Sequence, residues 1–134
     1  MSDANVEIVK RVLSRLNDRD LDGALAYVAR DAELDWSRSE ALDRGVYHGH
    51  MGWRKWVIGR WEELSEVSFD PIEVIDASPD MVVTVTRVRG RGRASGVDVE
   101  ALGAALWTLR SGMVTHLRLY QSRDQALRAA GLEG

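Results

Sequence analysis

Residues 33–64, ELDWSRSEALDRGVYHGHMGWRKWVIGRWEEL, hold four of the five tryptophans and two of the three histidines. Residues 32–36 alternate between polar and apolar side chains, which predicts a short strand that ends beside Asp35 and Trp36. A polar loop over residues 37–48 follows, and loops of this length in compact domains often cover a binding site. The next apolar residues recur at the spacing of a buried helical stripe: Trp53, Trp56, Val57, Trp61 and Leu64. Together these elements predict a covered apolar pocket.

Upstream of this stretch, two helices are predicted. The first shows a stripe with a period of 3.6 residues, made by Val6, Val9, Val12, Leu13 and Leu16. Residues 17–20 break the pattern, and the Asp20 carboxylate can cap a second, shorter helix. The apolar residues of that second helix are Leu21, Ala24, Leu25 and Val28. A helical hairpin with a very short joint therefore precedes the first strand.

Downstream, the apolar period falls to two, which predicts strands. They cover residues 67–75, 81–93, 96–109 and 113–121, with a final helical turn or two over residues 124–130. Pro71 interrupts the first of these strands and predicts an edge or bulged position. The order of helix, helix, strand, helix and four strands in a meander predicts an α+β fold with one antiparallel sheet.

Composition narrows the class of protein. The chain has 134 residues, enough for one domain over residues 1–134, and its 45% hydrophobic content is ordinary for a globular protein. Zero cysteines exclude disulfides and zinc sites of the cysteine type. The first residues lack the apolar centre of a signal peptide, and no apolar run is long enough to cross a membrane, so a cytoplasmic protein without membrane contact is expected. A net charge of −3 argues against a general nucleic-acid binder.

Three segments carry a resemblance to a known family: LNDRDLDGALAYVARDAELDW (16–36), GVYHGHMGWRKW (45–56) and THLRLYQSRDQALRAAGL (115–132). With the element order, they make the chain similar to the SnoaL-like polyketide cyclases. These belong to the nuclear transport factor 2-like superfamily, with ketosteroid isomerase, scytalone dehydratase and limonene epoxide hydrolase. The resemblance implies a cone-shaped, cystatin-like fold, in which a strongly bent antiparallel sheet wraps around three N-terminal helices. It also implies a deep apolar cavity and a homodimer through the outer face of the sheet.

Asp35 is the candidate catalytic residue, because it matches the position of the general base in ketosteroid isomerase. An apolar pocket would desolvate its carboxylate and raise its pKa toward the range of a useful base. The alternative is an inert strand-end aspartate that binds the loop over residues 37–39. Val12 and Ala105 stand where the isomerase has its two oxyanion donors, each of which is worth about 10²–10³ in rate. Steroid isomerase activity is therefore not expected.

The predicted pocket walls are Trp36, Tyr47, His48, Trp56, Trp61, Trp107 and Gln121. Gln121 enters this set if the leucine face of the last strand, with Leu117 and Leu119, turns inward. His116, Arg118 and Tyr120 then face outward, and a slip of one residue would reverse both faces. The tryptophan pattern allows two interpretations. Indoles on a helical stripe usually pack in the core, but five in one small domain would also suit a flat polycyclic ligand.

Two polar patterns have structural explanations. His48 and His50 flank Gly49 and could share a metal, but a site needs a third ligand, so neither metal nor cofactor is expected. Arg87, Arg89, Arg91 and Arg93 alternate and should project from one face of a strand. Asp98 and Glu100 can pair with Arg91 and Arg89 across the hairpin. The alternative is that RGRGR binds RNA, and the ion-paired outer face is favoured.

The sequence thus predicts a small-molecule-binding SnoaL-like domain for an apolar ligand, polycyclic in one version of the hypothesis. A cofactor-independent isomerase, cyclase or dehydratase with Asp35 as base is one form of it. A non-catalytic ligand-binding or dimerisation domain is the other, because the fold supports both kinds of protein.

Overall fold

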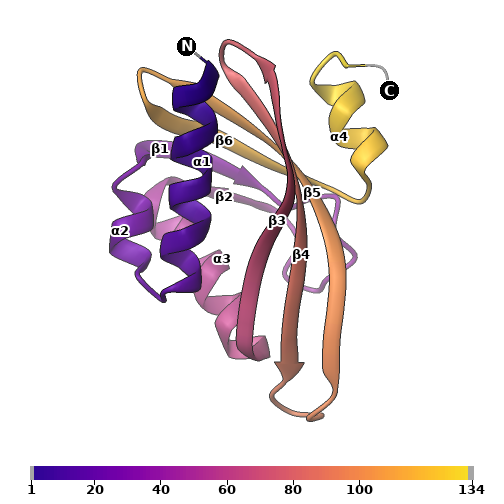
Figure 1. Ribbon diagram of the computed structural model, residues 1–134. Coiled ribbons are helices and arrows are strands. Elements are labelled where there is room, and N and C mark those ends of the chain that lie inside the picture. The colour runs from indigo at the N-terminus through magenta and orange to yellow at the C-terminus, as the bar shows by residue number, and fades with distance from the viewer. Residues whose placement is uncertain (1, 133–134) are drawn as a thin grey trace.

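The computed structural model describes residues 2–132 and confirms the α+β class (Figure 1). Its elements follow the predicted order, with one additional strand. They are α1 (Ser2–Asn17), α2 (Leu21–Leu25), β1 (Val28–Asp35), β2 (Val46–His48), α3 (Gly49–Glu63), β3 (Leu64–Ser78), β4 (Met81–Gly92), β5 (Asp98–Arg110), β6 (Met113–Tyr120) and α4 (Arg123–Ala129).

The strands form one six-stranded sheet in the order β2-β1-β6-β5-β4-β3. The four C-terminal strands make the predicted antiparallel meander. The prediction of a wholly antiparallel sheet is wrong at one ladder, because β1 pairs with β6 in parallel, with Leu34 opposite Leu117. Since β1 and β6 are distant in sequence, no hairpin joins them to set an antiparallel direction. β2 was not predicted, because three residues are too few to show a period.

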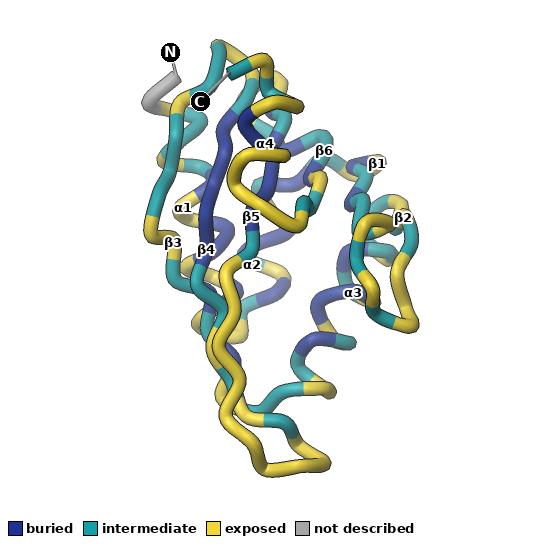
Figure 2. Tube along the Cα trace, turned by 90° about the vertical axis from the view of Figure 1, so that its right-hand side faces the viewer, coloured by how far each residue is buried: buried dark blue, intermediate teal, exposed yellow. Residues whose placement is uncertain are grey.

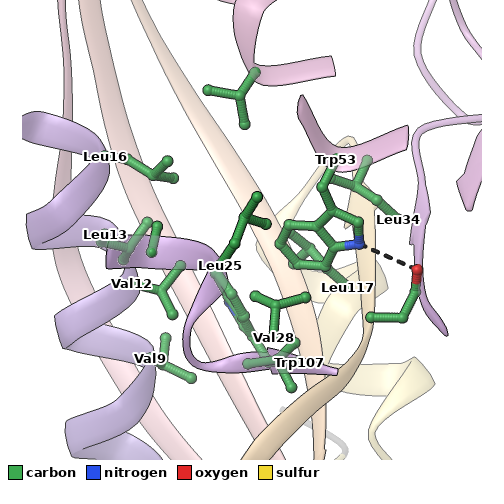
Figure 3. Packing of buried hydrophobic residues seen from close by; sticks show 14 of the residues in the cluster. Val9, Val12, Leu13, Leu16, Leu25, Val28, Leu34, Trp53, Trp107 and Leu117 are labelled. Carbon is green, nitrogen blue, oxygen red and sulfur yellow. Dashed lines mark hydrogen bonds between the residues drawn. The ribbon is translucent and has the colours of Figure 1, made fainter. Parts of the chain in front are cut away.

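The sheet is strongly curved, and α1, α2 and α3 lie on its concave side, whereas α4 lies on the other side (Figure 1). The main core fills the space between the helices and the concave face. It joins Val9 and Val12 of α1 to Trp53 of α3 and to Trp107 and Leu117 of the sheet (Figure 3). The hydrophobic effect therefore holds helices and sheet together at this face.

The short α2 is set by its cap. The Asp20 carboxylate accepts a hydrogen bond from the Gly23 amide at 2.9 Å, as predicted. The helix nevertheless ends at Leu25, and Val28, which was expected on it, is the first residue of β1. On β1, Val28 is 1% exposed, so its side chain packs in the core from a strand instead of a helix.

β3 is the edge strand predicted from Pro71. Its pairing with β4 shifts register between Ser65 and Ser68, between Pro71 and Glu73, and again near its end. Proline has no amide to donate to a ladder, so an edge with an irregular register suits it. These irregularities accompany the long bend that closes the sheet around the helices.

The outer face of the sheet carries a second, smaller core under α4. Ala126 and Leu127 of α4 pack against Val83, Ala104 and Leu106. Ser122 caps this helix, since its hydroxyl accepts from the Gln125 amide at 3.2 Å. In residues 2–132, no helix is both long and apolar enough to cross a membrane.

The alternating arginines Arg87, Arg89, Arg91 and Arg93 make largely the predicted ion pairs. Arg91 pairs with Asp98 at 3.1 Å, and Glu100 lies 3.1 Å from Arg87 and 3.5 Å from Arg89. Arg93 departs from the row, because β4 ends before it and its Nε donates to the Trp61 carbonyl at 2.9 Å. Figure 2 shows how exposed this end of the β4–β5 hairpin is. Exposed ion pairs of this kind contribute little stability.

Candidate ligand cavity

A cavity of about 410 Å³ lies on the concave side of the sheet. Its walls come from α1, α3, the loop after β1 and the strands β1 and β3–β6. Most of the lining is apolar, including Leu13, Leu34 and Phe69, with buried Thr84 and Thr86 on the β4 wall. The cavity thus occupies the interior of the bent sheet.

Four of the predicted wall residues line the cavity: Trp36, Trp56, Trp107 and Gln121. The other three do not belong to its lining. The Tyr47 hydroxyl donates to the Asp43 carbonyl, and burial, together with the nearby Asp43, raises the pKa of Tyr47. His48 is the residue before α3, and its side chain is exposed. The Trp61 ring stacks with the Arg19 guanidinium, which lies 5.0 Å from the ring centroid. The role of these residues toward a ligand stays a prediction.

Asp35 lies on the opposite face of β1 from the cavity. Leu34 and Trp36 line the cavity, and side chains alternate along a strand, so the carboxylate between them points away. It accepts from the Ser37 hydroxyl at 2.6 Å, the Ser37 amide at 3.0 Å and Arg38 Nη1 at 3.0 Å. Burial alone would raise the pKa of Asp35, but these donors outweigh it and lower the pKa below its ordinary value of 3.8.

The expected rise in the pKa of Asp35 is therefore wrong. The reason is the alternation of side chains along β1. Trp36, the next residue, faces the cavity, so the Asp35 carboxylate faces the other side of the sheet. The observed contacts are those of the alternative, an aspartate that organises the loop after its own strand. A role for Asp35 as a base stays a prediction.

The last strand has the predicted orientation. Leu117 and Leu119 line the cavity and pair with Trp107 and Ala105 of β5. Tyr120, predicted on the outer face, also contributes to the lining where β6 ends, and Arg38 stacks on its ring at 4.6 Å. The end of β6 therefore belongs to the cavity rim as well as to the outer face.

Three buried indoles of the cavity wall differ in how their N–H groups are satisfied. Trp53 donates to the Ala32 carbonyl at 3.2 Å (Figure 3), and Trp107 donates to the Thr84 hydroxyl at 2.9 Å. Trp56 is 9% exposed, and its Nε1 has no partner among the described residues. Its ring instead packs edge to face on Trp36, with centroids 5.6 Å apart.

Arg60 is a charged lining residue that was not predicted from the sequence. It is 9% exposed, and its guanidinium stacks over Trp36 at 3.9 Å from the ring centroid. Nη2 pairs with Asp43 at 2.6 Å and Glu63 at 3.3 Å. Arg60 follows Trp53 and Trp56 at helical spacing, so the stripe could have revealed it, but charged residues are usually assigned to the water side of a helix.

The loop after β1 covers one end of the cavity, and Ser39 and Ala41 contribute to the lining. Three contacts hold the loop in place: the Trp36 amide donates to the Gly45 carbonyl at 2.8 Å, Gln121 Nε2 donates to the Arg38 carbonyl at 2.6 Å, and Asp43 pairs with Arg60. Gln121 therefore anchors the loop from the end of the sheet.

The two positions where the isomerase has oxyanion donors hold apolar side chains. Ala105 lines the cavity and presents only a methyl group there, and Val12 is buried in the core. His50, one of the two candidate metal ligands, has Nε2 at 2.7 Å from the Val28 carbonyl. In the described part of the chain, no group of three histidine, cysteine, aspartate or glutamate residues could hold a metal ion.

Residues 9–117 match the family described as SnoaL-like domain, and the chain therefore belongs to this family. This match confirms the resemblance to the SnoaL-like proteins. No curated protein matches the sequence.

Solved structures confirm the cystatin-like, ketosteroid isomerase-like fold. TerC co-crystallised with polyporic acid has a TM-score of 0.77 at 20% identity, with 96% of this chain and 98% of that chain covered. A nuclear transport factor 2-like protein from Burkholderia xenovorans LB400 has a TM-score of 0.74 at 27% identity, covering 97% and 98%. A putative polyketide cyclase from Xanthomonas campestris pv. campestris has a TM-score of 0.76 at 17% identity, covering 96% and 97%.

Proposed function

We propose that the chain binds a small apolar molecule in the cavity, as a domain of the cyclase or isomerase type. The observation that carries the proposal is the cavity itself, whose 410 Å³ falls within the usual range of about 300–1,000 Å³ for ligand sites. Its lining combines apolar side chains with a few polar groups, which is the composition of sites that enclose a small molecule. Trp36, Trp56 and Trp107 offer flat surfaces that favour an aromatic or polycyclic ligand.

The similar structures support this class of ligand. TerC was crystallised with polyporic acid. Two other similar structures are putative polyketide cyclases, from Sinorhizobium meliloti and Xanthomonas campestris. These proteins share the fold, and a polyketide-like or other apolar ligand for this chain is part of the proposal.

Catalysis is the second part of the proposal, with Asp35 as the candidate base. The contacts of Asp35 with Ser37 and Arg38 favour an anchoring role instead. The second candidate function is a non-catalytic binding or dimerisation domain. It is favoured because the Asp35 carboxylate is already held by hydrogen bonds, and because Val12 and Ala105 provide no oxyanion donor. Turnover that Asp35→Asn abolishes, with binding retained, would identify Asp35 as a base and remove this second candidate.

The test is a thermal-shift screen with steroids, anthraquinones and terpenoids. A ligand at about 100 times its dissociation constant adds roughly 2.7 kcal/mol to the free energy of unfolding. In a domain of this size that raises the melting temperature by about 5–10 °C. Ala105→Leu fills the cavity and should reduce the shift, whereas Ala129→Leu, an exposed change on α4, should retain it. No shift with any compound, or equal shifts in both variants, would refute binding in the cavity.

A homodimer through the outer face of the sheet also stays a prediction. α4 covers the part of that face formed by Val83 and Leu106. The exposed remainder includes Leu102 of β5, which is 61% exposed and also reaches the cavity lining. Light scattering on the purified protein measures its mass directly, and Leu102→Glu should convert a dimer through this face to a monomer. A dimer that persists in Leu102→Glu would place the interface elsewhere.

A further inference from the structure

β5 is longer than its neighbour β6, and the difference leaves a stretch of open sheet edge. The last ladder pair of β6 joins Tyr120 to Ala104, and within the described residues 2–132, residues 98–103 pair only with β4. Figure 1 shows the β4–β5 hairpin extending beyond the end of β6. We propose that this edge binds an extended segment of another protein, which adds to β5 as an antiparallel strand and carries lysine or arginine at alternate positions.

The backbone groups of β5 alternate in direction, and hydrogen bonds at both ends of the strand fix the phase. The Gly92 amide donates to the Val97 carbonyl at 2.9 Å. The Leu109 amide donates to the Asp80 carbonyl at 2.9 Å, so odd-numbered residues bond toward the β4 side. The register between β4 and β5 is continuous, and the direction alternates along an antiparallel ladder. The groups that point to the open edge are therefore the N–H and C=O of Asp98, Glu100 and Leu102.

The two outer edges of the sheet differ from this inner edge. β3 contains Pro71 and shifts its register against β4, and β2 has only three residues. Proline, irregular register and short length all keep a sheet edge from pairing with other chains. Residues 98–103 contain no proline, pair with β4 without a bulge, and are exposed over 98–102 (Figure 2). This stretch is consequently the regular, accessible edge of the sheet, the kind that accepts an added peptide strand.

Charge selects the chemistry of the partner. The side chains of Asp98 and Glu100 are 83% and 60% exposed, and their arginine partners all belong to β4. Since β4 lies on the other side of β5, a strand added at the open edge meets the carboxylates first. Opposite charges across a ladder stabilise the pairing, which favours lysine or arginine opposite each carboxylate. Val99 and Ala101 face the cavity, so the alternate residues of the partner would be apolar and lie at the cavity rim.

A second copy of this chain is a poor occupant of the same edge. An antiparallel self-pairing centred on Val99 places Asp98 opposite Glu100 of the second copy. A pairing centred on Glu100 places this carboxylate opposite its own counterpart, and like charges directly opposite destabilise a ladder. A pairing centred further along would bring the hairpin of the second copy onto Ala104, where Tyr120 already pairs. The edge therefore suits a basic segment of another protein.

The experiment uses a short capped peptide in which lysine and valine alternate, labelled for fluorescence anisotropy. In the proposed ladder, a lysine opposite Glu100 turns its own N–H toward β5. N-methylation of the lysines blocks that edge of the peptide, whereas N-methylation of the valines blocks the edge that faces water. The first change should weaken binding at least about tenfold, and the second should leave the affinity within about threefold. A peptide of alternating glutamate and valine should also bind at least about tenfold more weakly.

Two variants at one position separate the backbone from the charge. Glu100→Pro removes an amide that points to the open edge, so β4 loses no hydrogen bond. Glu100→Ala is the matched control, because it removes the same charge and keeps the amide. Glu100→Pro should bind the lysine–valine peptide at least about tenfold more weakly than Glu100→Ala, with melting temperatures that agree within about 5 °C. In wild type, the peptide should slow amide hydrogen exchange at Asp98, Glu100 and Leu102.

Several results would overturn the inference. Equal weakening by the two N-methylated peptides would show attraction by charge without a ladder, and tight binding of the glutamate peptide would contradict the charge of the partner. Slowed exchange confined to β2 or β3 would place the peptide at another edge. A dimer that Glu100→Pro dissociates in sedimentation would make a second copy the occupant. No binding of the lysine–valine peptide would end the proposal and leave the cavity and its ligand unaffected.

Discussion

Replacing Asp35 by asparagine distinguishes two roles by the sign of a stability change. In the structure, the carboxylate accepts three hydrogen bonds from Ser37 and Arg38, and its pKa is lowered. Removing the charge should therefore destabilise the protein. A desolvated base with a raised pKa would behave in the opposite way, because its buried charge costs free energy and asparagine relieves that cost. The two hypotheses predict changes of opposite sign at neutral pH.

The size of the effect follows from the contacts. Asparagine keeps one oxygen that can still accept from the Ser37 amide, but it loses the charge that strengthens the other two bonds. The bond from the Ser37 hydroxyl is well formed at 2.6 Å, and a hydrogen bond to a charged group contributes about 1.5–3 kcal/mol. Arg38 is 40% exposed, so its ion pair contributes only about 0–1 kcal/mol. We expect a loss of about 2 kcal/mol in the free energy of unfolding.

The assay is thermal or urea unfolding of wild type and Asp35→Asn across a pH series. A loss of about 2 kcal/mol lowers the melting temperature of a domain of this size by roughly 5–10 °C. The pKa of Asp35 is lowered in the folded state, so its stabilisation is complete above the unfolded value of 3.8 and disappears as the pH falls through the folded value. The two unfolding curves should therefore differ at pH 7 and converge in acid.

A stability of Asp35→Asn equal to or greater than wild type at pH 7 would refute this reasoning. So would a stability difference that grows as the pH falls. Ser37→Ala is the matched control, because it removes the hydroxyl donor and leaves the carboxylate in place. It should reproduce part of the loss, and the double variant should lose less than the sum of the two single variants, since they share one contact.

Two other predictions concern the sheet wall of the cavity and the start of α3. Trp107→Phe and Thr84→Val should each cost about 1–3 kcal/mol, because each leaves the other partner of a buried hydrogen bond unsatisfied; urea unfolding of the double variant should show a loss smaller than the sum, and strict additivity would contradict the bond. Gly49→Ala should destabilise by at least about 1 kcal/mol, because Gly49 has φ +67° at the start of α3 and an added Cβ would lie 3.0 Å from the Arg30 carbonyl. The control Gly103→Ala, which has open space around it, should be close to neutral in the same unfolding assay, and equal losses would show that backbone strain at Gly49 is not the cause.

Periodicity predicted most of the fold because each long element buries one face. The stripe of α3 and the alternation of β4, β5 and β6 each extend over enough residues to show their period. Val28 illustrates the limit. Its apolar side chain suits a short helix and a strand equally well, and only the pairing with β6 decides between them. The three-residue β2 shows no period at all, and its pairing with β1 is likewise tertiary.

The candidate site was harder to predict than the fold for two reasons. Asp35 was matched by sequence position, but a shift of one residue along a strand moves a side chain to the other face of the sheet, and Trp36 occupies the cavity instead. Arg60 was missed because a charge on a buried stripe is unusual, and its burial depends on Asp43 and Glu63, which approach it only in the fold. Trp36, Trp56 and Trp107 do line the cavity, since burial suits an indole both in a core and in a cavity wall.

The parallel pairing of β1 with β6 has a consequence for folding kinetics. The four C-terminal strands join through short turns and can associate by local contacts, but β1 must find β6 across most of the chain. Closing so long a loop costs entropy before any contact compensates for it, so this pairing should form late and limit the folding rate. The cavity is completed only by this step, because Leu34 and Trp36 join Leu117 and Leu119 in its wall. Ligand binding should consequently report the last stage of folding, after the meander has formed.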